Sequence, residues 1–117
     1  MSGFLVYFVT DEVDDDLARA MRQHVRALAD SRTWVRHAPG FFDDPDPGEG
    51  LRTTGGYLRV EDAASTDAGA LFSAVRLFSG EHQVTIELQW QERILGHIRS
   101  GTADSGLQRA ISIATGR

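Results

Sequence analysis

A strict alternation of polar and apolar residues fills the stretch Gln83-Val84-Thr85-Ile86-Glu87-Leu88-Gln89-Trp90. Period-two alternation is typical of a strand with one face on a core and the other in water. After a short polar break, the segment Ile94-Leu95-Gly96-His97-Ile98-Arg99 is compact enough to be its antiparallel partner. A helical pattern follows, so the last third of the chain is predicted to run strand, turn, strand, helix.

At the other end of the chain, the segment Phe4–Val9 is apolar on both faces and rich in aromatic and β-branched residues, which predicts an interior strand. Thr10 and Asp11 supply capping side chains for a helix that runs to about Ala29 or Asp30. One apolar stripe marks its buried face: Val13, Leu17, Met21, Val25 and Leu28.

The middle of the chain is less regular. Residues 33–37 and 41–42 could belong to short strands, and residues 56–60 are predicted to form one. Between them, residues 43–50 combine prolines, glycines and four carboxylates, which favours an exposed, flexible loop within one domain.

A second helix begins at Ser65 or Thr66 and ends near Gly80, which suits the left-handed position after a helix. Thr102 is predicted to cap the last helix. The expected order is β-α-(loop)-β-α-β-β-α in a single domain, residues 1–117. Helices on one face of a mostly antiparallel sheet make a two-layer α+β sandwich the expected fold.

Composition narrows the class of protein. The 117 residues, 41% hydrophobic and 25% charged, are typical of a globular domain. The absence of cysteine excludes disulfides and thiol chemistry. A net charge of −5 argues against a nucleic acid partner, because phosphate binding relies on clustered cations. All twelve basic residues are arginine, a bias typical of GC-rich bacterial coding sequences. With no membrane-length apolar run and no basic leader, we expect a cytoplasmic protein without membrane contact.

Histidine is the first candidate for metal or acid–base chemistry, and the chain has four: His24, His37, His82 and His97. No two have the spacing of a zinc motif. The acidic segment Asp43–Glu49 lacks the ligand pattern of a calcium loop, because two prolines interrupt it. We therefore predict no metal and no cofactor.

A nucleophilic active site is also not predicted. Asp104 lies near His97 in sequence, but the Gly-x-Ser-x-Gly elbow is missing. The segment Ser100-Gly101-Thr102 is what a strand-to-helix turn requires. No catalytic residue is assigned.

Two groups of residues are candidates for binding a protein partner. Three arginines form a stripe on the first helix, which is either a solvated face with i,i+4 pairs such as Asp15–Arg19 or a docking face for an acidic partner. Three aromatic residues flank the acidic loop and would suit an interface if exposed, or the core if buried. The candidate residues are Arg19, Arg22, Arg26, Trp34, Phe41 and Phe42.

Several stretches carry a family resemblance. They are the arginine-bearing helix (17–22), the Pro47-Gly48-Glu49 linker, the small-residue helix (68–71), the strand 84–88 and the closing segment 103–111. In the order of these stretches and in their local residue patterns, the chain resembles the effector-associated constant component proteins of bacterial conflict systems, over nearly its whole length. It departs from them in the bulky turn at 90–93 and in the strand-like segment 55–60.

The resemblance implies a non-catalytic adaptor that links a peptidase- or nucleotide-dependent sensor to a variable effector through protein–protein contacts, with homodimer formation left open. Two other classes remain. A dimeric α+β barrel (ferredoxin-like) protein would bind or oxidise a small molecule between sheet and helices, where His24, His37 or Trp34 could line a pocket. An immunity or inhibitor protein would place the acidic loop over a basic toxin site. An enclosed pocket favours an enzyme, and an exposed patch favours an adaptor.

Overall fold

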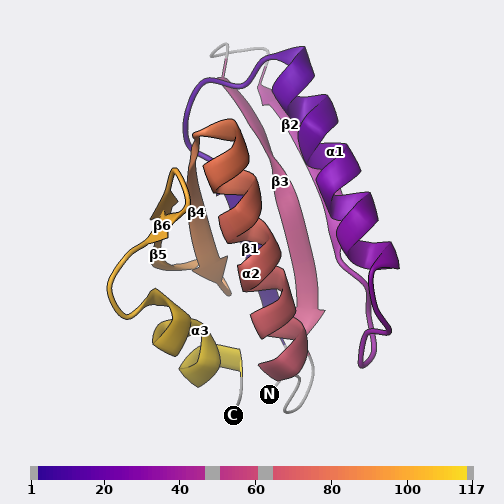
Figure 1. Cartoon of the computed structure of the whole chain (residues 1–117), viewed down its shortest axis with the longest axis vertical. Coiled ribbons are helices and arrows are strands. Elements are labelled where there is room, and N and C mark those ends of the chain that lie inside the picture. The colour runs from indigo at the N-terminus through magenta and orange to yellow at the C-terminus, as the bar shows by residue number, and fades with distance from the viewer. Residues whose placement is uncertain (1–2, 47–50, 61–64, 116–117) are drawn as a thin grey trace.

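The computed structural model describes residues 3–46, 51–60 and 65–115. Three helices lie on one face of a six-stranded antiparallel sheet, which confirms the predicted two-layer α+β class (Figure 1). The strands are β1 (Gly3–Val9), β2 (Gly40–Asp46), β3 (Leu51–Val60), β4 (Thr85–Trp90), β5 (Arg93–Arg99) and β6 (Thr102–Ala103). The helices are α1 (Asp15–Asp30), α2 (Ser65–His82) and α3 (Leu107–Thr115).

The strand order is β2-β3-β1-β4-β5-β6, so β1 lies inside the sheet as predicted. The first six elements follow the ferredoxin-like order β-α-β-β-α-β, in which β3 is inserted between β1 and β2. The hairpin partner β5, the short β6 and α3 extend this unit beyond β4.

The core lies between the sheet and the helices. Alternate residues of β1 (Leu5, Tyr7 and Val9) are buried under the helices, as are Ile86 and Leu88 of β4. The predicted stripe of α1 contributes Met21, Val25 and Leu28 to the buried cluster, with Val13 and Leu17 packed against it. The apolar residues on the inner side of α2 are buried as well: Ala68, Leu71, Phe72, Val75 and Phe78.

The start of α1 differs from the prediction. Asp14, not Thr10 or Asp11, is the N-cap, and its Oδ1 accepts a hydrogen bond from the Leu17 amide at 2.8 Å. Asp11 instead accepts a hydrogen bond from the Thr85 amide at 2.6 Å and so joins the start of β4 to the end of β1. More than one acidic residue near the start of α1 could serve as its N-cap. Asp11 does not, because it bonds the Thr85 amide of β4, and Asp14 takes this position.

The acidic loop is shorter than predicted. Residues 43–46 are the second half of β2, while residues 47–50 lie outside the described residues. Proline lacks a backbone N–H group, so it is tolerated mainly in edge strands. Strand β2 is an edge strand, and on the side of Pro45 away from β3 no neighbouring strand requires a hydrogen bond. Arg52 offsets the carboxylate repulsion by bonding Asp43 at 2.7 and 2.9 Å and Asp15 at 2.6 Å. Asp15 therefore pairs with Arg52 rather than with Arg19.

Residues 33–37, considered as a short strand, form bends instead. Their backbone is held by the buried Asp67 of α2, which accepts a hydrogen bond from the Val35 amide at 2.9 Å and pairs with Arg32 at 3.2 Å. Residues 33–37 are thus held by contacts with Asp67 instead of by pairing with a neighbouring strand.

The predicted C-terminal hairpin is confirmed as β4 and β5, but two local predictions are wrong. Gly80 lies within α2, which continues to His82. Thr102 belongs to β6 and does not cap α3. The hairpin also contains a bulge between Leu88 and Gln89 that shifts the register. Ile94 therefore pairs with Gln89 and is exposed, whereas Ile98 is buried.

Among the described residues, no helix combines the length and apolar character needed to cross a membrane.

Candidate functional site

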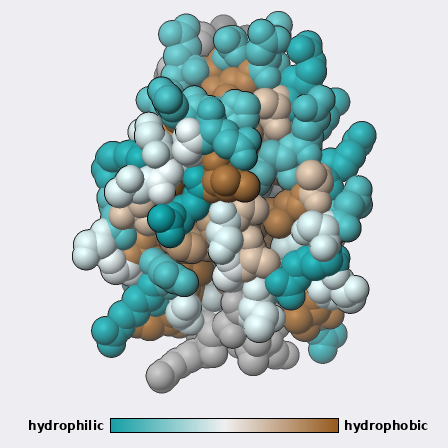
Figure 2. Space-filling model, in the orientation of Figure 1, coloured by the Kyte–Doolittle hydropathy of each residue, from teal (hydrophilic) through white to brown (hydrophobic). Residues whose placement is uncertain are grey.

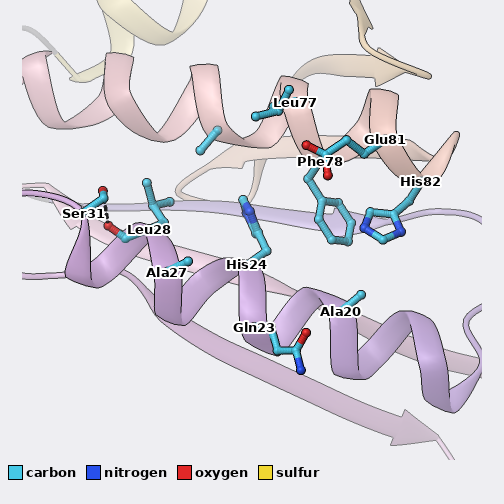
Figure 3. A pocket seen from close by; sticks show the side chains of 11 residues that line it. Ala20, Gln23, His24, Ala27, Leu28, Ser31, Leu77, Phe78, Glu81 and His82 are labelled. Atoms are coloured by element: carbon cyan, nitrogen blue, oxygen red, sulfur yellow. Dashed lines mark hydrogen bonds between the residues drawn. The ribbon is translucent and has the colours of Figure 1, made fainter.

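An open groove lies between α1 and α2 on the helix side of the molecule. It has a volume of about 490 Å³, and residues of both helices line it (Figure 3). Small and apolar side chains form most of its walls: Ala20, Ala27, Leu28, Ala74, Leu77 and Phe78. Leu77, in the second half of α2, is 64% exposed. Figure 2 shows hydrophobic side chains at several places on this face, among them its middle, interspersed with hydrophilic ones.

A buried tyrosine and a histidine meet beneath the groove. The Tyr7 hydroxyl lies 3.0 Å from His24 Nε2, so the central strand is joined to α1. The Tyr7 ring fits because Gly56, its partner on β3, has no side chain; a Cβ there would lie 2.5 Å from the Tyr7 hydroxyl oxygen. Burial raises the pKa of Tyr7, so the phenol stays protonated.

Three rings follow one another along the groove. His24 rises from α1, and Phe78 and His82 descend towards it from α2 (Figure 3). The ring centroids are 4.9 Å apart for His24 and Phe78 and 4.3 Å apart for Phe78 and His82. Burial, with a smaller contribution from His82, lowers the pKa of His24 to about 4. At neutral pH His24 is therefore an uncharged imidazole that can donate or accept a hydrogen bond.

The groove has an acidic end. Glu81 lines it directly. A second hollow, which shares Ala20 and His82 with the groove, is lined by Glu12, Asp14 and Asp16 around the start of α1. The surface is thus apolar between the helices and negatively charged at one end.

The structure places the three arginines of α1 at different contacts. Arg19 is exposed and pairs with Asp16 at 3.1 Å. Arg22 lies over the ring of Phe41, 5.3 Å from its centroid, and both line a shallow hollow with Arg52. Hydrogen bonds from Arg52 lower the pKa of Asp43 in the same hollow. Arg26 is exposed on α1.

The three aromatic candidates are also separated. Trp34 is partly buried against the core, donates a hydrogen bond from Nε1 to the Ala29 carbonyl at 3.0 Å and lies under Arg32. Phe41 packs partly against the core. Phe42 pairs with Gly55 and belongs to the opposite face of the sheet.

That opposite face carries no helix in the described part of the chain, and its centre is aromatic. Phe4, Val6 and Phe8 of β1 point to it, together with Tyr57 of β3. Phe4 is 44% and Tyr57 39% exposed, and their rings contact edge to face with centroids 6.1 Å apart. Solvated sheet faces are usually polar, so this face is a second candidate surface.

A charged cluster lies at the edge of this face. His97 Nε2 is 3.0 Å from Glu87 Oε1, and the His97 amide donates a hydrogen bond to Asp104 at 2.9 Å. That backbone hydrogen bond, followed by the side-chain contact with Arg99, lowers the pKa of Asp104. Within the described ranges, no group of three or more acidic or histidine side chains is arranged to hold a metal ion.

Sequence reasoning did not assign Tyr7, Leu77 or Glu81 to a site. The Gly55-Gly56 pair inside a strand was the one available signal, because glycine there often marks a close approach by another group. Searches of protein-family models, curated proteins and solved structures find no match to the chain.

Proposed function

We propose that this protein is a non-catalytic protein–protein interaction module that receives an amphipathic helix of a partner protein in the groove between α1 and α2. The observation that carries the proposal is the open apolar groove itself, with Leu77 64% exposed on its wall. Helix-in-groove recognition uses such a surface, in which apolar anchors of the partner enter between two helices.

The charge of the groove defines the partner more closely. Glu81 and the acidic first turn of α1 lie at one end, so the partner helix should carry arginine or lysine next to its apolar stripe. Ala20, Ala27 and Ala74 allow a helix backbone to approach closely. The partner that these features favour is a basic amphipathic helix.

The resemblance to effector-associated constant component proteins gives this proposal a setting. The module would act in the cytoplasm of a bacterium as an adaptor in a conflict system, joining a sensor or peptidase to an effector. The groove would then hold one of these components.

The second candidate function is small-molecule binding in the same groove. It is favoured by the Tyr7–His24 pair, which supplies an uncharged hydrogen-bonding imidazole beneath apolar walls, and by a volume within the usual range for ligand sites. The ferredoxin-like order of the first six elements is also the order expected for this alternative.

The test is a binding measurement on a purified pair. A photo-crosslinking residue at position 77 of the full chain identifies the component held in the native host, and calorimetry on the purified partner then gives the affinity. We expect Leu77→Glu to weaken binding about a hundredfold and Glu81→Arg about tenfold. Ile113→Glu, at an exposed apolar position of α3, is the matched control and should change little. Equal affinity for L77E, E81R and the control would refute the groove as the docking site.

A further inference from the structure

The sheet face that carries no helix in the described part of the chain has a raised side and a hollow side, separated by β1. On the β3 side stands Tyr57, whose ring leans over Gly40 of β2, where a Cβ would lie 2.4 Å from the ring. On the β4 side is a hollow of about 460 Å³, lined by Phe4, Val6, Gln89, Gln91 and Glu92. Phe4, Val6 and Phe8 form an apolar row between the two sides.

The two sides of this face also differ in charge. Arg59 lies on the β3 side and its guanidinium is 6.0 Å from the centroid of Phe4. Glu92 lies at the turn on the β4 side, at the same end of β1, where the Gln91 amide bonds the Phe4 carbonyl at 3.2 Å. A cation and a carboxylate therefore flank Phe4 from opposite sides.

We propose that this face pairs with the same face of a second copy of the chain. A twofold axis that lies in the interface parallel to β1 exchanges the two sides of the face. It brings each Tyr57 to the hollow beside Val6 of the other copy and each Arg59 towards Glu92 of the other copy. The apolar row of one copy packs against the apolar row of the other along the axis. The same rotation therefore gives complementary shapes, opposite charges and hydrophobic contact.

The same operation aligns the strands of the two sheets, which is the common arrangement of face-to-face sheet packing. Five strands about 4.8 Å apart and five residues of about 3.3 Å give a flat footprint of roughly 400 Å² per copy. That is about half of a standard interface, so we expect a weak, reversible dimer. The groove between α1 and α2 lies on the other side of the molecule and stays open in this dimer.

Sedimentation equilibrium of the full chain, from low micromolar to submillimolar concentration, tests the proposal. We expect a monomer–dimer equilibrium. Tyr57→Ser should weaken it about tenfold, and so should Arg59→Glu and Glu92→Arg as single changes. The double charge reversal R59E/E92R should restore most of the lost affinity, because the pair then attracts with its signs exchanged.

Controls separate this face from the rest of the surface. Leu77→Glu on α2 and Arg109→Glu on α3 should leave the equilibrium unchanged, and circular dichroism should confirm that each variant is folded. A chain that stays monomeric at every concentration would overturn the proposal. So would growth beyond a dimer, or a double reversal no stronger than the singles. None of these results bears on the groove, whose binding test uses a different partner and different variants.

Discussion

Tyr7 is a polar residue at the centre of an apolar sheet, and its position depends on two neighbours. Gly56 leaves the space for its ring, and His24 Nε2 lies 3.0 Å from its hydroxyl oxygen. A Cβ at position 56 would meet the ring, so Gly56→Ala should move the tyrosine away from α1. The hydrogen bond therefore joins two elements, β1 and α1, and the glycine of β3 leaves the space for the ring.

The double-mutant cycle of Tyr7→Phe and His24→Gln measures that bond. We expect Tyr7→Phe to lower the free energy of unfolding by about 1 kcal/mol, because a partly buried hydrogen bond is lost without a change in packing. In the H24Q background the same change should have a smaller effect. Urea denaturation at pH 7 gives the four values. A cost of Tyr7→Phe that is independent of residue 24 would contradict a direct bond.

His24 should also make stability depend on pH. Its pKa is lowered to about 4 in the folded chain, against 6.5 for the ordinary side chain. Between these values the unfolded state binds a proton that the folded state does not, so stability rises with pH across this range. We expect a loss of roughly 2 to 3 kcal/mol as the pH falls from 6.5 to 4.

The measurement compares the free energy of unfolding of the wild-type chain and His24→Gln at pH 7 and at pH 4.5. Carboxylates titrate in both chains and cancel in the difference. The wild type should lose more stability than H24Q, and His82→Gln should give an intermediate loss because the His82 charge is the smaller cause of the shift. Parallel pH profiles for wild type and H24Q would contradict a buried neutral histidine.

At the scale of elements, sequence periodicity predicted the strands and helices whose apolar faces form the core. The alternation of 84–90 and the apolar stripe of α1 appear in the structure with the expected faces buried, because burial imposes these periods. Only residues 41–42 of strand β2 were considered as a strand. Its second half was predicted to be a loop, since Asp43, Asp44 and Pro45 have low strand propensity and form a strand only at an edge with Arg52 to bind Asp43.

The candidate site was less predictable for a related reason. Its residues come from β1, α1 and α2, and the contact between Tyr7 and His24 exists only after the helices pack on the sheet. The arginine stripe of α1 was visible as a pattern, but the structure gives Arg19 and Arg22 separate partners. Composition and residue spacing do not indicate which side chains from different elements come into contact.

A close approach between α2 and the β5–β6 turn gives a prediction for two glycines. Gly101 has φ +87°, and a Cβ there would lie 3.2 Å from Gly80 Cα, whereas a Cβ on Gly80 would make an ordinary 3.5 Å contact. Gly101→Ala should therefore lower the free energy of unfolding by about 1 to 2 kcal/mol. Gly80→Ala should raise it by up to about 1 kcal/mol, because alanine is the better helix former. Thermal unfolding of both variants gives the signs, and a destabilising Gly80→Ala or a neutral Gly101→Ala would contradict this packing.

At the scale of the whole molecule, the ferredoxin-like unit and its C-terminal extension share one core. The Ser79 hydroxyl of α2 has the Val84 and Ile98 carbonyls as acceptors for its single hydrogen, at 2.7 and 3.3 Å, and accepts a hydrogen bond from the Gly101 amide at 3.0 Å. Leu107 and Ile111 of α3 belong to the same buried cluster as the residues of β1. The extension thus shares its buried cluster with β1, and α3 adds a third helix to the helix layer.

Leu107 tests whether the extension and the rest of the chain unfold together. Its side chain is almost completely buried, so Leu107→Ala should lower the free energy of unfolding by about 2 to 4 kcal/mol through lost burial and a cavity. Ile113→Ala removes a similar apolar side chain from an exposed position of the same helix and should cost well under 1 kcal/mol. Because the core is shared, tryptophan fluorescence and far-ultraviolet circular dichroism should report one coincident transition in the wild type and in L107A. Two separate transitions, with only the first moved by Leu107→Ala, would mean that α3 is an independent attachment to the sheet.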